Sequence, residues 1–437
     1  MNLSVFGNRQ LVRMSAAIGL TAGMLVTMTP IAQAVVTSCK AENLTSGGPP
    51  KADLQVVIDA ASPGDTVQVS GVCTGGFTIG KDLTLVGNAT VATPQATLDG
   101  GGVVTVLKVL GDATPHVMLT DLTITNGSAR AQGGGRGGGI LSSRATLTLN
   151  GSSSVSDNSS TGNGGGIYMN SGTVVMKGSA TVLNNSATAY GAGIYMISGT
   201  LLVDGAASVS NNSAYSAGGV FVGSSTATFS GSAAVSNNTT TGGGGGGGIV
   251  VHDSSVALNE SATVSRNSSS GNGGGIEVGD HYLYHSTVTL SDSSSVTGNT
   301  AADQAGGIYN AFGDLTMKGS SSVSGNSGRR GGGIFNTSTL ILKGSSSVEG
   351  NTGRRGGGIL NRTGSVTMNH RASVSENRAH QGGGIYNKGS VAMNDSSLVT
   401  HNVALVAGGG ILNNLGVVTT SGSAAVVANT PDDCVGC

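Results

Sequence analysis

The chain repeats one short pattern at a nearly constant interval. A Gly-rich element that ends in Ile or Val recurs every 25 to 32 residues, and a second marker, Val-x-x-Asn, keeps the same phase. A period of this length is typical of solenoids, in which each repeat forms one coil and buries its apolar face only against its neighbours. The eleven first markers end at Ile140, Ile167, Ile194, Val220, Ile249, Ile276, Ile308, Ile334, Ile359, Ile385 and Ile411.

Each repeat consists of short segments with strand character. From Gly331 the chain reads GGGIFN, TLILKG and SSVEGN, and each segment alternates apolar and polar residues between turn residues. We therefore predict an all-β fold, a parallel β-helix solenoid with three short strands in each coil of about 26 residues. In such a stack every coil pairs only with the coils above and below it.

Two rows of asparagines are expected to stack from coil to coil. The Asn of Val-x-x-Asn recurs from Asn158 to Asn429, and each amide can bond the amide one coil away. Gly138 and Gly139 precede the first marker, where glycine suits the unusual backbone angles of a corner. A second row lies two residues after the apolar marker and is predicted to be a structural ladder: Asn310, Asn336, Asn361, Asn387 and Asn413.

The two ends of the chain differ from the repeats. Residues 1–34 are predicted to be a signal peptide cleaved after Ala34, because a basic start and an apolar run precede a small-x-small site. A lipoprotein signal at Cys39 is the alternative. Residues 35–75 are predicted to form an N-terminal cap with one helix and the first strand, residues 76–413 the β-helix, and residues 414–437 a C-terminal cap. We expect a secreted or cell-surface protein with no transmembrane segment in the mature chain.

The four cysteines lie only near the ends. Cys39 and Cys73 flank the predicted helix between Lys51 and Ala61, and Cys434 and Cys437 are the last two. Two terminal pairs in an exported chain predict two disulfides. For the C-terminal pair, a redox motif or half of a zinc site is the alternative.

The composition restricts the class of partner. Glycine accounts for 76 of 437 residues, charged residues for 10%, and the net charge is −1. A chain kept disordered by its charge would carry far more of it. A protein that binds nucleic acid is expected to be basic, so we predict no nucleic-acid partner.

The in-phase GGxI and x-x-N markers resemble the repeats of the polymorphic outer membrane proteins. The helix followed by PGDTVQVSG resembles the opening of right-handed parallel β-helix proteins of the pectate-lyase-like superfold. The family motif begins with Phe where this chain usually has Val, and family members end in a membrane β-barrel, which we do not expect here. The resemblance implies a right-handed β-helix and an exported, adhesin-like surface module.

No set of residues predicts catalysis, a cofactor or a metal site. Two glycosidase carboxylates would lie about 5 to 10 Å apart, and only Asp292 and Glu260 approach that arrangement. His252 and Asp253 are adjacent on a strand, so they face opposite ways. We predict a non-enzymatic, adhesin-like or glycan-binding protein. A polysaccharide lyase or glycoside hydrolase acting on acidic polysaccharide is one alternative, and a purely structural envelope protein is another.

Five arginines gather on three consecutive coils. Stacked coils would place them about 4.8 Å apart, and arginine suits bidentate contact with carboxylate or phosphate. The cluster predicts an anionic partner, such as an acidic glycan, a cell-wall polymer or a host surface. The alternative is a solvated corner whose charges discourage aggregation. The candidate residues are Arg329, Arg330, Arg354, Arg355 and Arg378, with His380.

Two further features are candidates for binding. The longest interval inserts GDHYLYHS, and insertions in solenoids become loops that often lie on the binding face, although a tolerated surface loop is the alternative. An aromatic row also follows the markers, and it stacks outside the coil if the marker Ile points inward, or lies in the core if not. The loop residues are His281, Tyr282, Tyr284 and His285; the aromatic row is Tyr168, Tyr195, Phe221, Tyr309, Phe335 and Tyr386.

Overall fold

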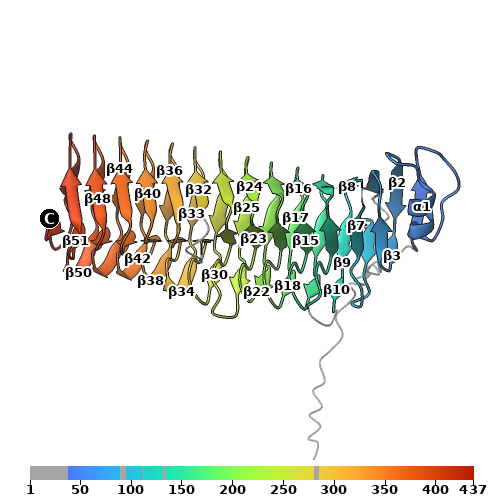
Figure 1. Cartoon of the computed structure of the whole chain (residues 1–437), viewed down its shortest axis with the longest axis horizontal. Coiled ribbons are helices and arrows are strands. Elements are labelled where there is room, and N and C mark those ends of the chain that lie inside the picture. The colour runs from blue at the N-terminus through green and yellow to red at the C-terminus, as the bar shows by residue number, and fades with distance from the viewer. Residues whose placement is uncertain (1–37, 89–94, 112, 131–133, 280–284) are drawn as a thin grey trace, which may run out of the picture. The chain divides into compact units, whose positions relative to one another are not determined.

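The protein is a parallel β-solenoid of about 13 turns with about 27 residues in each turn. The structure is a computed structural model and describes residues 38–88, 95–111, 113–130, 134–279 and 285–437. Equivalent strands of successive coils lie side by side (Figure 1). The predicted all-β parallel solenoid is confirmed. The predicted signal peptide lies outside the described residues.

Each coil from β7 (Leu107–Leu110) to β50 (Val403–Ala407) contains four strands rather than the predicted three. One coil comprises β39 (Ile334–Asn336), β40 (Thr339–Leu342), β41 (Ser347–Glu349) and β42 (Thr352–Arg355), which belong to sheets named here I, II, III and IV in that order. The prediction of three strands per coil was wrong because the fourth strand has no alternation of apolar and polar residues that would reveal it. In β42 the sequence is TGRR.

Sheet I begins each coil at the apolar marker, and sheet IV closes the coil before the next marker. The strands of sheet I are β4 (Phe77–Ile79), β7 (Leu107–Leu110), β11 (Ile140–Ser143), β15 (Ile167–Asn170), β19 (Ile194–Ile197), β23 (Val220–Gly223), β27 (Ile249–His252), β31 (Ile276–Val278), β35 (Ile308–Asn310), β39, β43 (Ile359–Asn361), β47 (Ile385–Asn387), β51 (Ile411–Asn413) and β54 (Cys434–Val435). The strands of sheet IV are β10 (Ser128–Ala129), β14 (Ser159–Ser160), β18 (Ser186–Ala187), β22 (Ser213–Ala214), β26 (Thr239–Thr240), β30 (Ser268–Ser269), β34 (Thr300–Gln304), β38 (Ser327–Arg330), β42, β46 (Arg378–Gln381) and β50 (Val403–Ala407).

Sheets II and III complete the coil. Sheet II has 15 strands, from β1 (Lys40–Asn43) and β2 (Thr66–Ser70) to β52 (Val417–Thr420), and sheet III has 14, from β3 (Val72–Thr74) to β53 (Ala425–Val427). The main core lies between sheets I, II and III, where apolar residues of each strand point inward. In one coil these are the fully buried Ile334, Leu340, Leu342 and Val348. The marker isoleucines therefore point inward.

The glycines before each marker allow the chain to turn sharply between sheets IV and I. Gly331 has φ of +68°, in the left-handed region that favours glycine. The next residue, Gly332, is required for a different reason, because a Cβ there would clash with the carbonyl of Thr352 in the next coil. In the coil of Gly138 and Gly139, the positive φ belongs to Gly137 instead, so our expectation for that pair was wrong.

The N-terminal end of the stack is covered by a helix and an antiparallel strand. Helix α1 (Leu54–Ala60) buries Leu54, Val57 and Ile58 and is capped by the Asp53 side chain. Strand β1 pairs antiparallel with β2, and the disulfide between Cys39 and Cys73 links the two sides of this end. The predicted helix and disulfide are confirmed.

At the C-terminal end the coil continues in register. Strands β52 and β53 extend sheets II and III beyond residue 414, and β54 adds to sheet I. The second predicted disulfide, between Cys434 and Cys437, is also present.

Candidate functional site

A groove of about 320 Å³ runs along the corner between sheets IV and I in the later coils. It has two basic walls and an apolar floor. We call it the basic groove, and its residues are Arg329, Arg330, Phe335, Arg354, Arg355, Leu360, Arg362, Tyr386 and Lys388.

The first wall comes from strands β38 and β42. These strands pair in parallel, with Arg330 aligned with Arg355. Arg329 and Arg354, each one residue earlier, form a second exposed pair of the same two coils. Neighbouring parallel strands are about 4.8 Å apart, so each pair presents two guanidinium groups one step apart along the stack.

The opposite wall consists of Arg362 and Lys388, which sequence reasoning missed. Each directly follows an asparagine of the second ladder, Asn361 or Asn387, and these asparagines are aligned in β43 and β47. Both cations are exposed. Alignment of the coils would have placed them in one row. Only the corner between sheets brings that row opposite Arg354 and Arg355.

The floor of the groove is the outward face of sheet I. Phe335, Leu360 and Tyr386 point away from the main core and form a separate apolar cluster, yet they are only 2%, 5% and 4% exposed. They pack against one another along the stack, and the Arg355 guanidinium lies 5.7 Å from the centre of the Tyr386 ring. Such cation–π contact holds an arginine in place over the ring.

The aromatic row therefore lies outside the coil and stacks along it. Ring centres are 5.2 Å apart between Tyr168 and Tyr195, 4.7 Å between Tyr195 and Phe221, and 5.1 Å between Tyr309 and Phe335. Burial in this stack, together with the neighbouring Tyr168, raises the pKa of Tyr195, and Arg136 partly opposes that effect. Since these rings are largely covered, they contribute to stacking rather than offer open faces to a ligand.

The charge of the basic groove is mostly uncompensated. Arg330 lies 3.8 Å from Asp303, and both side chains are about two-fifths exposed. The other five cations form no ion pair with the residues that the structure describes. Six cations around one hollow, in a chain of net charge −1, produce a strong local positive potential. The arrangement suits a ligand with several carboxylate, sulfate or phosphate groups.

Arg378 and His380 extend from the same corner but do not line the groove. In β46, Arg378 is aligned with Thr352, and Gln381 is aligned with Arg355. Arg378 is therefore equivalent to Thr352, which lies two residues before Arg354 in the neighbouring coil. The structure brings the first four arginines together and leaves these two exposed farther along the edge.

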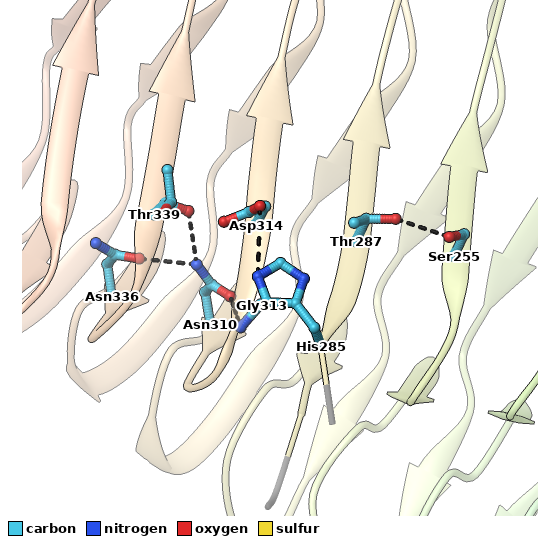
Figure 2. Close-up of polar contacts among 8 residues, drawn as sticks. All are labelled: Ser255, His285, Thr287, Asn310, Gly313, Asp314, Asn336 and Thr339. Carbon is cyan, nitrogen blue, oxygen red and sulfur yellow. Dashed lines mark hydrogen bonds and ion pairs between the residues drawn. The ribbon is translucent and has the colours of Figure 1, made fainter. Parts of the chain in front are cut away.

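Of the four candidate residues of the inserted loop, only His285 lies within the described part of the chain. Its Nε2 atom is 3.5 Å from Oδ2 of Asp314, and both side chains are exposed (Figure 2). His281, Tyr282 and Tyr284 lie outside the described part of the chain. His285 directly precedes β32 (Ser286–Leu290) of sheet II and is not part of the basic groove.

Both asparagine rows form continuous hydrogen-bond ladders. In the second, Asn310 donates to Asn336 at 2.8 Å and to the Thr339 carbonyl at 2.9 Å (Figure 2), and the same side-chain bond recurs to Asn361, Asn387 and Asn413. In the first, each Nδ2 from Asn158 onward donates to the next Oδ1 at 2.9–3.0 Å. The side chains of these asparagines form hydrogen bonds that hold successive coils together.

The carboxylates considered for catalysis bond backbone groups instead. Oδ2 of Asp292 accepts from the Glu260 amide, and Oε2 of Glu260 accepts from the Gly231 amide, each at 3.0 Å. His252 packs edge-on against Phe221, whereas Asp253 accepts from Ser224. Within the described ranges, no group of three or more His, Cys, Asp or Glu side chains could hold a metal ion.

Comparison with known proteins relates one repeat of the chain to a described family. Residues 152–170 match the Chlamydia polymorphic membrane protein repeat. This segment contains Asn158 and the Gly-rich marker that ends at Ile167. This match and the β-solenoid are consistent with repeats of the polymorphic membrane protein type in a β-helix. No curated protein and no solved structure matches the chain. In the described residues, no helix has the length and apolar character needed to cross a membrane.

Proposed function

We propose that this protein is an exported, non-enzymatic β-solenoid that binds acidic polysaccharide in the basic groove. The observation that carries the proposal is the convergence of six cations from two walls on one hollow of about 320 Å³. A polysaccharide with a carboxylate or sulfate on successive sugars offers charges along one line, as the walls do.

The fold does not require these cations. Other coils have Asn163, Ser216 or Asn272 at the position of Arg330 and stack equally well. The groove is also open along the axis of the coils, since it extends over three successive strands of sheet I. An extended polymer fits that geometry better than a compact ligand. Nucleic acid fits less well, because single strands are held by stacking on open aromatic faces, and the floor rings are covered.

Export is supported by two observations. The repeat match is to a membrane protein family, and disulfides persist mainly in oxidising compartments. A surface position would bring the basic groove into contact with envelope or host glycans, which is the adhesin-like role that the resemblance suggests.

The test is the binding of heparin oligosaccharides, with neutral dextran for comparison, measured by calorimetry at low and high salt. The variant Arg354→Gln with Arg355→Gln should weaken heparin binding about tenfold or more, because charge-assisted contacts are lost. Binding by the unchanged protein should weaken as salt rises. Dextran should not bind.

A matched control removes two cations from another corner. Lys318 and Lys343 are exposed and lie on successive coils, beyond β36 (Gly313–Met317) and β40 of sheet II. The variant Lys318→Gln with Lys343→Gln changes the net charge equally and should leave affinity within about twofold. Equal losses in the two variants would show non-specific charge attraction. No heparin binding at all would favour a purely structural protein.

A further inference from the structure

The outward face of sheet I continues well beyond the basic groove toward the N-terminus. One residue of each strand occupies the same row, and parallel pairing keeps the row in register. The row begins with Lys108 and continues through Leu141, Tyr168, Tyr195, Phe221, Val250, Glu277 and Tyr309 to Phe335.

A second hollow, of about 730 Å³, lies at the start of this row. It occupies the same corner between sheets IV and I, and its charged residues are Lys108, Arg130 and Arg136. All three are exposed, and none forms an ion pair with the residues that the structure describes. We call these three residues the N-terminal cations.

Arg136 reproduces the geometry of Arg355. Each arginine directly precedes the Gly-rich marker that opens the following coil, at Ile140 or Ile359. Each places its guanidinium over a tyrosine of sheet I one strand beyond that marker, at 5.3 Å for Arg136 over Tyr168 and 5.7 Å for Arg355 over Tyr386. The same contact between an arginine and a tyrosine therefore occurs in both hollows, although they are far apart in the sequence.

Between the two hollows, other residues occupy the positions of these cations at the corner. At the position of Arg136 and Arg330, the intervening coils carry Asn163, Tyr190, Ser216, Gly245, Asn272 and Gln304. The middle also contains Glu277 in the floor row and Asp303 on the wall. Positive charge is therefore concentrated at two places in one corner rather than spread evenly along it.

We infer that the N-terminal cations form a second binding site for the same acidic polysaccharide, and that one extended chain engages both sites. This inference rests on the proposed function. Seven strand-to-strand steps separate the coils of Arg136 and Arg330, or about 34 Å at about 4.8 Å per step. A chain longer than this span gains affinity because its second contact is intramolecular.

The experiment compares size-fractionated heparin oligosaccharides shorter and longer than about 34 Å when extended. The unchanged protein should bind the longer fraction about tenfold or more tightly per molecule than the shorter one. The variant Lys108→Gln with Arg136→Gln should lose that gain while its affinity for the shorter fraction changes about twofold or less. Arg130→Gln, which leaves the contact on Tyr168 intact, should lose part of the gain.

The outcomes separate this inference from the proposed function. Failure of both fractions to bind would overturn both. Binding in which the longer fraction shows no gain, or keeps its gain in Lys108→Gln with Arg136→Gln, would overturn only the second site. Tighter binding of single-stranded nucleic acid than of either heparin fraction would overturn the assignment of the ligand class. Circular dichroism of each variant shows whether the solenoid is intact.

Discussion

Asparagine side chains connect each coil to the next in the interior of the stack. From Asn185 onward, each side-chain oxygen of the first ladder accepts from both the side chain and the backbone amide of the preceding asparagine, and each side-chain nitrogen donates to a backbone carbonyl, as at Asn267 and Asn299. The ladder ends at Asp433, whose Oδ1 accepts both donors of Asn429. An aspartate suits this last position because it accepts hydrogen bonds and has no donor left to satisfy.

Replacement of one ladder residue should therefore be costly. In Asn299→Ala the backbone and side-chain donors of the fully buried Asn267 lose their acceptor, and the Val264 carbonyl loses a donor. Unsatisfied buried groups cost about 1–3 kcal/mol each, so we expect a loss of about 2–5 kcal/mol in the free energy of unfolding. Urea unfolding followed by circular dichroism measures it. Asn394→Ala, at a half-buried site outside the core, should cost less than about 1 kcal/mol.

At the scale of elements, the N-terminal cap depends on one buried carboxylate. Asp65 is 6% exposed and accepts from Asn43 Nδ2 of β1 at 2.7 Å and from the Ser62 amide at 2.9 Å. These hydrogen bonds, the one from Asn43 first, lower the pKa of Asp65. They join the antiparallel strand β1 to the turn that precedes β2.

The cap should loosen in acid for this reason. Because the pKa of Asp65 is lower in the folded state, its stabilisation is complete above the unfolded aspartate pKa of about 3.9 and is lost as pH falls through the folded value. Hydrogen exchange in residues 38–70, corrected for intrinsic rates, should rise in Asp65→Asn relative to the unchanged protein at about pH 7, and the difference should shrink below about pH 4. Asp204→Asn, at an exposed site, should show neither effect. A constant difference at all pH values would contradict the role of the charge.

The strands of sheets IV and I differ in how far their contribution to the basic groove could be predicted from the sequence. The pattern GRRGGGI occurs in two successive coils, so the alignment of Arg330 with Arg355 follows from the period alone. Arg362 follows a different strand, and nothing in the sequence shows the angle at which sheets IV and I meet. That angle depends on the short strands of sheet IV, whose polar residues carry no periodic signal.

At the scale of the whole molecule, each coil contacts only the coils beside it, so damage should stay local. Phe229 is fully buried at the end of β24 (Thr226–Phe229), aligned with Val203 of β20 (Thr200–Val203) and Leu258 of β28 (Ser255–Leu258). Phe229→Ala should cost about 3–5 kcal/mol through the cavity that it leaves. Hydrogen exchange should rise in these three strands and remain unchanged in α1 and β52.

Thr228→Ala, on the outward face of the same strand, is the control and should leave exchange nearly unchanged. A rise in exchange along all the described coils after Phe229→Ala would mean that the solenoid unfolds as a single cooperative unit.

The sequence by itself determined the period, the parallel stack, the alternation of apolar and polar residues along each strand, and the rows of asparagine and arginine that repeat from coil to coil. These properties depend only on the spacing of residues along the chain, because stacking in register carries each position onto its equivalent one coil away. The tertiary structure decided that a fourth strand turns the chain back toward sheet I. That corner brings Arg362 and Lys388 opposite Arg354 and Arg355, and it places Arg136 in the separate second hollow. Neither arrangement follows from the sequence, because contacts across a corner depend on how the sheets pack.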